Sequence, residues 1–290
     1  MREISVVVCT RNRPGLLARA LASLAGQTLD RDRFEIVVAD NGDGSGVEVA
    51  QHAGADLALR VAEAGVSGTR NAGWRAAGAD RFAFLDDDAE AGRDWLEIGL
   101  GLLGGGAAAA GGPILPSYES APPAWFRDEY ELRSWGDEQR PLVPGESFSA
   151  SNLFLLREPL ETLGGFDLRL GMRGKGVAVG EEPAFFEQLW RRRPGTTVIY
   201  SPNLVVRHLV AARKTTVSYQ LRRAAAAGEA WAVHTSSGRR DAGRMTRDVA
   251  AAVALSARAV TRPHRPWQRW AVEELGPVAG RIGSIRGSLR

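Results

Sequence analysis

Cysteine and lysine are the scarce residues of this 290-residue chain. Cys9 is the one cysteine, so no internal disulfide can form and secretion offers no visible advantage. The sequence does not open with a charged segment, an apolar core and a small-residue cleavage site, so we expect no signal peptide and a cytoplasmic protein. A G-x-x-x-x-G-K-[S/T] motif is also missing, which argues against a P-loop nucleotide site.

Uninterrupted apolar runs are short. One uncharged stretch, residues 98–118, has the length of a membrane span, but it is crowded with Gly and Ala and contains Pro113 and Pro116. We predict a helix end, a loop and a short strand there instead of a spanning helix.

The net charge of +3 is unevenly spread. Residues 214–290 contain Lys214 and thirteen arginines against five acidic residues, so this region is nine charges positive and the rest of the chain is six negative. The region is predicted to be helical, and its tryptophans are Trp231, Trp267 and Trp270. Three roles stay open: peripheral contact with the inner face of an anionic membrane, a cap over a substrate site, or pairing in a homodimer. No nucleic-acid recognition motif accompanies the charge, so nucleic-acid binding is not expected.

The first 90 residues alternate between strand-like and helix-like runs. Apolar runs predict strands over residues 3–9, 34–39, 56–61 and 82–85. Apolar residues at helical spacing predict helices over 16–24, 47–52 and 66–77. Alternation of this kind predicts an α/β fold, with a mainly parallel sheet, covering helices and right-handed crossovers.

Polar residues follow the predicted strands, and three aspartates end the fourth one. Since the carboxyl ends of parallel strands meet at one edge of a sheet, ligands bind there. Asp86 and Asp88 should share a face while Asp87 points away, because side chains alternate along an extended chain. Carboxylates this close repel each other unless a cation lies among them, and Mg²⁺ or Mn²⁺ prefers such oxygen ligands. The alternative is a solvated acidic turn.

Residues 8–13, 38–42, 67–73 and 84–88 carry four motifs in a recognisable order and spacing. Together they resemble the nucleotide-sugar half of a family 2 glycosyltransferase of the GT-A fold. The resemblance implies a nucleoside-diphosphate sugar as donor, with UDP as the first choice and dTDP or GDP next. The residues that it implies for donor binding are Cys9, Thr10, Arg11, Asp40, Arg70, Asn71, Asp86, Asp87 and Asn152.

The metal and the catalytic base are likewise implied by the resemblance. The D-x-D motif of the family maps onto Asp86, toward the ribose, and Asp88, toward Mn²⁺ or Mg²⁺. His208 resembles a histidine that many GT-A enzymes aim at the metal, although a lone histidine is as often structural. The family places its base in an acidic pair, which implies Glu182 as base and Glu181 in a supporting role. Acids in a first helical turn also stabilise the helix by themselves.

These assignments predict an inverting enzyme that transfers one sugar at a time to an acceptor hydroxyl. Processive relatives carry a Q-x-x-R-W motif, which is missing after Gln188. The first alternative is a sugar-phosphate nucleotidyltransferase, although such enzymes open with a Gly-rich basic loop that residues 9–14 lack. The second is a nucleic-acid- or membrane-binding protein that acts through the basic tail.

The predicted organisation has three parts. Residues 1–112 form the nucleotide-sugar half of the GT-A domain, residues 113–212 its acceptor-binding and catalytic half, and residues 213–290 a basic helical extension. Residues 117–145 are predicted to be an irregular insert whose aromatics either stack on a substrate or pack together. Residues 148–157 are predicted to be a strand that includes Ser151 and Asn152, which resemble a family landmark. A Gly-rich loop over residues 170–180 looks mobile.

Overall fold

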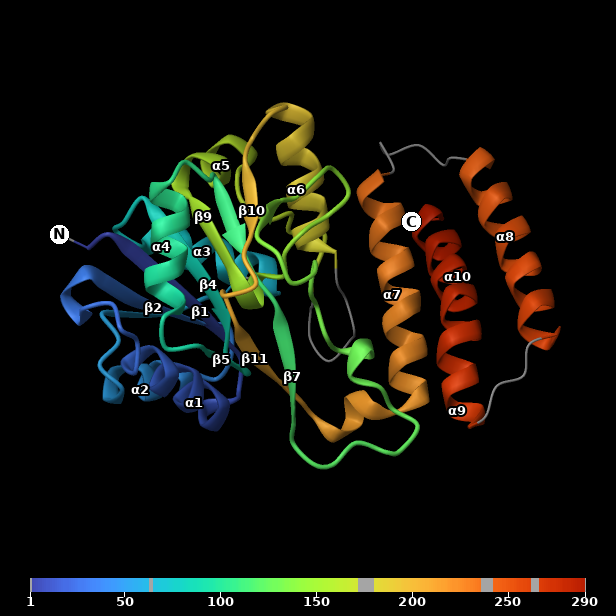
Figure 1. Ribbon diagram of the computed structural model, residues 1–290, viewed down its shortest axis with the longest axis horizontal. Coiled ribbons are helices and arrows are strands. Elements are labelled where there is room, and N and C mark those ends of the chain that lie inside the picture. The colour runs from blue at the N-terminus through green and yellow to red at the C-terminus, as the bar shows by residue number, and fades with distance from the viewer. Residues whose placement is uncertain (1, 63–64, 172–179, 236–241, 262–265, 290) are drawn as a thin grey trace.

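The computed structural model describes residues 2–62, 65–171, 180–235, 242–261 and 266–289, and its body contains two sheets (Figure 1). The strands are β1 (Ile4–Thr10), β2 (Phe34–Asp40), β3 (Leu57–Arg60), β4 (Arg81–Asp86), β5 (Ala89–Ala91), β6 (Ala109–Gly111), β7 (Ile114–Tyr118), β8 (Arg140–Pro141), β9 (Leu153–Leu156), β10 (Val198–Tyr200) and β11 (Val206–Val210). The larger sheet has the order β3-β2-β1-β4-β9-β6-β10-β8, and the smaller one has the order β5-β11-β7.

The first four strands of the large sheet are parallel. β1 pairs with β2 and with β4, and β2 pairs with β3, all in parallel. β9 runs antiparallel between β4 and β6, and β10 is parallel to β6. The predicted α/β class with a mainly parallel sheet is therefore confirmed.

Six helices cover the large sheet, three on each face. They are α1 (Pro14–Ala25), α2 (Ser45–His52), α3 (Val66–Ala76), α4 (Trp95–Gly104), α5 (Arg157–Leu163) and α6 (Glu181–Arg192). On β1, Val6 and Val8 point into the core that contains α1, α2 and α4, whereas Val7 and Cys9 point into the core that contains α3, α5 and α6. All seven residues of β1 are buried, which explains its nearly continuous apolar sequence.

The small sheet brings a distant histidine to the acidic turn. β5 begins directly after Asp88, and β11 pairs antiparallel with it so that His208 lies opposite Ala89. Two segments that are about 120 residues apart in the chain are thus fixed side by side by backbone hydrogen bonds.

The strand predicted over residues 148–157 is mostly wrong. Residues Ala150–Asn152 form a 3₁₀ turn, β9 is limited to four residues, and Arg157 already begins α5. The hydroxyl of Ser149 accepts a hydrogen bond from the backbone N–H of Ser151, so a local side-chain contact replaces ladder pairing.

The insert between β7 and β9 is mostly irregular, as predicted, with a 3₁₀ turn at Asp128–Tyr130 and the short strand β8. Trp125 and Phe126 are buried and pack edge to face, and Phe126 also contacts Tyr118 and Tyr130. The packing interpretation therefore holds for these rings. Trp135 stands apart from them and is 38% exposed.

The C-terminal region is helical, as predicted, and it lies at one side of the body (Figure 1). After a 3₁₀ turn at Ala212–Thr215 it consists of α7 (Val217–Thr235), α8 (Ala242–Thr261), α9 (Trp267–Trp270), a π-helical turn (Ala271–Leu275) and α10 (Gly276–Ser288). Among the described residues, no helix combines the length and the apolarity needed to cross a membrane. Most of the Gly-rich loop discussed above, residues 172–179, lies outside the described part of the chain.

Glycines let α7 and α10 approach until their backbones touch. A Cβ atom at Gly228 would overlap the carbonyl oxygen of Gly280, and one at Gly283 would overlap the carbonyl oxygen of Ala225. Neither contact leaves room for any larger residue without separating the two helices.

Candidate active site

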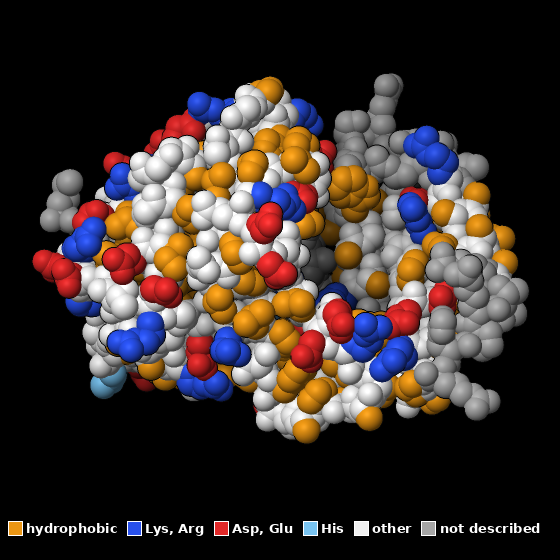
Figure 2. All heavy atoms as spheres, viewed as in Figure 1, with side chains coloured by type: hydrophobic (Ala, Val, Ile, Leu, Met, Phe, Trp, Pro, Cys, Tyr) orange, Lys and Arg blue, Asp and Glu red, His pale blue; other side chains and the backbone are white. Residues whose placement is uncertain are grey.

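A cavity of about 1360 Å³ opens at the carboxyl ends of β1 and β4. Its lining comes from the loop after β1, the acidic turn after β4, the first turn of α6, the insert, and one face of α7. Figure 2 shows the surface hollowed between the α/β body and the C-terminal helices. The cavity therefore lies at the edge of the sheet where the sequence places its polar residues.

Asp86, Asp88 and His208 form a cluster at the base of this cavity. One possible ligand atom from each lies within 4.8 Å of the other two. His208 Nε2 is 3.2 Å from Asp88 Oδ1. Two carboxylates and an imidazole are a donor set that can hold a divalent ion.

Asp87 lies outside this cluster. β4 ends at Asp86, so Asp87 and Asp88 form a turn, and the strand alternation that we expected does not extend to them. Its buried carboxylate accepts a hydrogen bond of 2.7 Å from the Thr10 hydroxyl and pairs with Arg13 Nη2 at 2.9 Å. The other terminal nitrogen of Arg13 lies 2.9 Å from Asp88 Oδ2. Burial raises the pKa of Asp87 to about 7, although the charge of Arg13 opposes the rise. Asp87 thus ties the loop after β1 to the acidic turn.

Asp86 and Asp88 are held in their ionised forms. Burial opposes the charge of Asp88, but the hydrogen bond and charge of His208, together with Lys214, hold its pKa well below the usual range. Burial opposes the charge of Asp86 too, but the charge of Arg70, the hydrogen bond from Ser151 and the charge of His208 together lower its pKa. A pair that is already deprotonated can bind a cation without first releasing protons.

The acidic pair opens α6 at a point where the chain requires glycine. Gly180 has a φ of +110°, which L side chains rarely adopt. A Cβ atom at Gly180 would also lie 2.7 Å from the Cβ of Ala230 on α7. Glu181 and Glu182 follow in the first turn of α6, where the helix dipole favours carboxylates, and both are buried.

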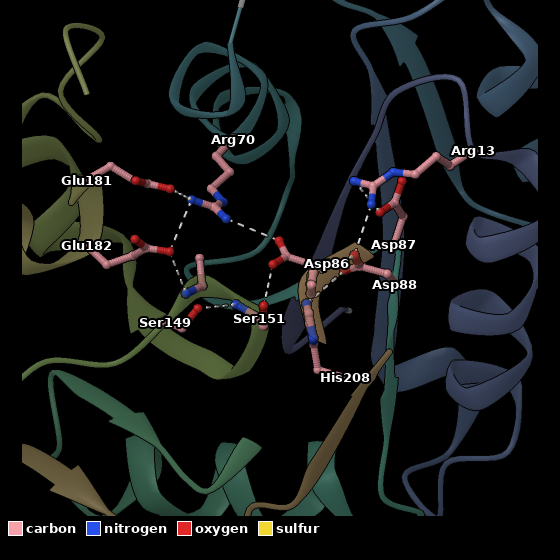
Figure 3. Close-up of polar contacts among 12 residues, drawn as sticks. Arg13, Arg70, Asp86, Asp87, Asp88, Ser149, Ser151, Glu181, Glu182 and His208 are labelled. Atoms are coloured by element: carbon pink, nitrogen blue, oxygen red, sulfur yellow. Dashed lines mark hydrogen bonds and ion pairs between the residues drawn. The ribbon is translucent and has the colours of Figure 1, made fainter. Parts of the chain in front are cut away.

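Arg70 of α3 connects this acidic pair to the cluster of Asp86, Asp88 and His208 (Figure 3). Its Nη1 lies 2.8 Å from Glu181 Oε1 and 3.3 Å from Glu182 Oε1. Its Nη2 lies 3.1 Å from Asp86 Oδ1. Glu182 Oε1 also accepts a 3.0 Å hydrogen bond from the backbone N–H of Ala150. The buried guanidinium therefore offsets the negative charge of three carboxyl groups.

The two glutamates have different surroundings. Burial and the neighbouring Glu182 raise the pKa of Glu181 to about 7, even though Arg70 lowers it in part. Glu181 Oε2 is buried without a hydrogen-bond partner among the described residues. Glu181 therefore keeps a proton to a higher pH than an ordinary glutamate does.

Among the predicted donor-binding residues, several lie in the cavity. Cys9, Thr10 and Arg11 line it from β1 and the loop that follows. Arg70 and the three aspartates of the acidic turn line it as well. Arg11 is exposed there, so its guanidinium is free to stack on a flat ring.

Three predicted donor-binding residues do not face the cavity. The carboxylate of Asp40 accepts the backbone N–H groups of Gly42 and Gly46, at 2.7 and 3.1 Å. Asn71 bonds the backbone of Phe166 with both ends of its amide. Asn152 donates to two backbone carbonyls and accepts from the indole of Trp95. These buried side chains hold loops in place, and any effect that they have on a donor passes through those loops.

The sequence interpretation gave Arg13 and Lys214 no role in the site, and it named Ser151 only as part of a family landmark. Ser151 lies in the cavity, and its hydroxyl donates a hydrogen bond to Asp86 Oδ2. Lys214 Nζ is 4.0 Å from Asp88 Oδ2. Arg13 and Ser151 each stand beside a residue that the motifs highlighted, but for Lys214 only its rarity in the sequence could have drawn attention.

Solved structures place the fold among GT-A glycosyltransferases. A mannosyltransferase from Pyrobaculum calidifontis, solved with GDP-Man and Mn²⁺, aligns with a TM-score of 0.62 at 20% identity and covers 98% of this chain and 87% of that one. GalNAc-T7, solved with UDP, GalNAc and Mn²⁺, aligns with a TM-score of 0.57 at 16% identity, over 80% of this chain and 50% of that one.

Residues 5–164, more than half of the chain, match the family model described as glycosyl transferase family 2. The chain belongs to this family, and it is a glycosyltransferase. A glucosyl-dolichyl phosphate glucuronosyltransferase from Haloferax volcanii is 27% identical over 71% of this chain and 69% of the relative. The succinoglycan biosynthesis protein ExoM from Rhizobium meliloti is 29% identical over 78% of this chain and 73% of the relative.

Proposed function

We propose that this glycosyltransferase is metal-dependent and inverting, and that it moves one sugar from a nucleoside-diphosphate sugar to an acceptor hydroxyl. One observation carries the proposal. Arg70 contacts both glutamates of α6 and also Asp86, so a candidate general base and a candidate metal cluster share one cavity. Membership of the family favours this function over the nucleotidyltransferase alternative.

Asp86, Asp88 and His208 would hold the ion. The mutual proximity of their ligand atoms and the lowered pKa values of both aspartates fit a divalent cation. An imidazole beside two carboxylates suits Mn²⁺ better than Mg²⁺, which prefers oxygen ligands. When bound, such an ion offsets the negative charge that gathers on a leaving nucleoside diphosphate.

Glu182 is the proposed base. The N–H of Ala150 and the guanidinium of Arg70 fix one oxygen of its carboxylate. The carboxylate takes the proton of the acceptor hydroxyl while that oxygen bonds to the anomeric carbon, and the bond from this carbon to the diphosphate oxygen breaks. Attack from the face opposite the leaving group inverts the configuration. Glu181 has a raised pKa and keeps a proton to a higher pH than an ordinary glutamate does, so we assign it the supporting role.

The donor is proposed to carry UDP, with dTDP or GDP next. The solved relatives contain GDP-Man in one case and UDP in the other, so the fold accommodates both bases. Membrane contact and pairing with a second copy stay predictions. Either kind of contact would cover the exposed side chains of Val249, Val253 and Trp267.

Thermal unfolding tests this function. The protein is heated with UDP, dTDP, GDP, CMP or ADP, each with and without Mn²⁺. A ligand at 100 times its Kd stabilises the folded state by about 2.7 kcal/mol, so we expect one diphosphate to raise the melting temperature only when Mn²⁺ is present. Asp88→Asn should abolish the metal-dependent shift.

Glu182→Gln is the matched control, because its carboxylate lies outside the metal cluster. This variant should keep the shift with nucleotide and Mn²⁺ while losing sugar transfer. A shift that survives Asp88→Asn would show that the aspartates do not hold the ion, and no shift with any nucleotide would refute the donor site.

A further inference from the structure

The cavity has more room than one substrate requires. Sites for a single small ligand are typically about 300–1,000 Å³, and this cavity measures about 1360 Å³. The loop after β1 and the acidic turn account for one side of it. The opposite side is built from the insert, the 3₁₀ turn before α7, α7 itself and one residue of α10.

That opposite side is strongly cationic. Arg133, Arg213, Lys214, Arg222, Arg223 and Arg286 line it, together with two acids, Glu131 and Glu229. Six positive groups against two negative ones leave a clear excess of positive charge on one wall of a cavity. Low-dielectric walls strengthen the field of such an excess.

Three of these arginines are not neutralised by a carboxylate of the described residues. Glu131 is buried and already accepts hydrogen bonds from Arg223 Nη1, at 2.6 Å, and from Gln220 Nε2, at 2.9 Å. By contrast, Arg133, Arg213 and Arg222 are exposed, and none makes an ion pair with another residue in the described ranges. We call these three residues the cationic wall.

The wall is contiguous with the metal cluster. Lys214 follows Arg213 directly, and its Nζ lies 4.0 Å from Asp88 Oδ2. Arg222, on α7, lines the same cavity. The positive surface thus begins at the metal cluster and continues onto α7, away from the strand ends where a nucleotide is expected.

Exposed apolar side chains line the same cavity as these cations. Leu132, Trp135 and Trp231 line the same cavity and are 37%, 38% and 54% exposed. A wall that offers guanidinium groups beside exposed rings fits a molecule with an anionic group and a flat or apolar portion.

We propose that the cationic wall binds a phosphate group of the acceptor, so that the enzyme glycosylates a phosphate-bearing molecule. Guanidinium groups match phosphate oxygens in pairs, and carboxylates that could neutralise them are already engaged or remote. This inference rests on the proposed function, because it takes the second ligand of the cavity to be the acceptor.

The test measures binding by tryptophan fluorescence, with Mn²⁺ and the nucleoside diphosphate that stabilises the protein both at saturation. The probes are a ten-carbon prenyl phosphate, its uncharged alcohol, glucose 1-phosphate and glucose. We expect each phosphate to bind at least tenfold more tightly than its uncharged counterpart. A prenyl phosphate that binds more tightly than glucose 1-phosphate assigns the phosphate to a lipid, and the reverse order assigns it to a soluble sugar phosphate.

The double substitution Arg213→Gln and Arg222→Gln should weaken phosphate binding about 10- to 100-fold. Binding of the uncharged probes and of the nucleotide with Mn²⁺ should not change. Arg213→Lys with Arg222→Lys should restore part of the affinity, since lysine keeps the charge without the paired geometry. Arg191→Gln, an exposed arginine on α6 outside the cavity, is the matched control and should have no effect.

Equal binding of phosphates and their uncharged counterparts would overturn the inference. So would a double variant that loses nucleotide affinity instead of phosphate affinity, because the wall would then serve the donor. If the wild-type protein binds no nucleotide with Mn²⁺, the proposed function itself fails, so the two failures can be told apart.

Discussion

At the scale of single residues, Glu181 is a buried carboxyl whose charge changes close to neutral pH. Its pKa in the folded protein is about 7, against an ordinary value of 4.5. The folded state therefore holds this proton more tightly than the unfolded chain does. The stability gained in this way is complete below about pH 4.5 and is lost as the pH rises through about 7.

Glu181→Gln should remove this pH dependence, because the amide keeps the shape of the side chain and cannot ionise. As the pH rises from 5 to 8, the free energy of unfolding of the variant should increase by roughly 1–3 kcal/mol relative to that of the wild type. Urea denaturation at both pH values measures the difference. Glu161→Gln, the same substitution at an exposed position of α5, should give no such trend. If the free energies of unfolding of Glu181→Gln and the wild type differ by the same amount at both pH values, the raised pKa is contradicted.

Residue identity alone could not separate side chains that face the cavity from those that hold loops. Ser151 and Asn152 are adjacent, yet one contacts Asp86 and the other bonds buried backbone carbonyls. Asp40 ends β2 and Asp88 follows β4, but backbone N–H groups surround the first and cationic side chains the second. Whether a polar side chain faces the cavity or holds a loop depends on which backbone groups the folded chain leaves without partners, and contacts between distant segments decide this.

At the scale of elements, α7 and α10 are held together by contact between their backbones. Gly283 lies so close to Ala225 that an added methyl group would meet a carbonyl oxygen. Because backbone atoms cannot rotate away as a flexible side chain can, the two helices would have to separate.

Gly283→Ala should therefore destabilise the protein by about 1–3 kcal/mol, despite the better helix propensity of alanine. Gly101→Ala on α4 is the control, since nothing lies within 4 Å of its added Cβ. That exposed substitution should instead stabilise the protein by about 0.5–1 kcal/mol. Urea denaturation followed by circular dichroism compares the two, and equal effects would refute the close contact.

The elements of the first 90 residues could be predicted because their signals are local. Buried parallel strands and amphipathic helices differ in period, and α3 was predicted to within one residue. The position of β9 could not be predicted in this way. It lies antiparallel between β4 and β6, and contacts across the sheet decide that order, whereas its own sequence does not.

At the scale of the whole molecule, Cys9 reports on global unfolding. It is the one thiol of the chain, only 9% exposed, and burial raises its pKa to about 12. Since the thiolate is the reactive form, iodoacetamide at pH 8 should modify the folded protein extremely slowly.

Labelling in increasing urea should follow the same transition as circular dichroism, and the nucleotide with Mn²⁺ should move both to higher urea concentration. Cys9→Ser combined with Arg191→Cys provides the control, because an exposed thiol on α6 should react at the rate of a free thiol without urea. Rapid labelling of Cys9 in the native protein would show that the end of β1 opens locally.

The stretch that matches the family ends at residue 164, whereas the cationic side of the cavity extends to residues 213–234 on the 3₁₀ turn and α7. Two of the three residues of the cationic wall, Arg213 and Arg222, belong to this later segment, whereas Arg133 lies in the matched stretch. Under the proposed function, mutation of the later segment would change what receives the sugar while leaving what is transferred untouched. A lineage could in this way acquire new glycosylated products by altering one 3₁₀ turn and the helix that follows it, and an engineer could exchange the same segment between homologues.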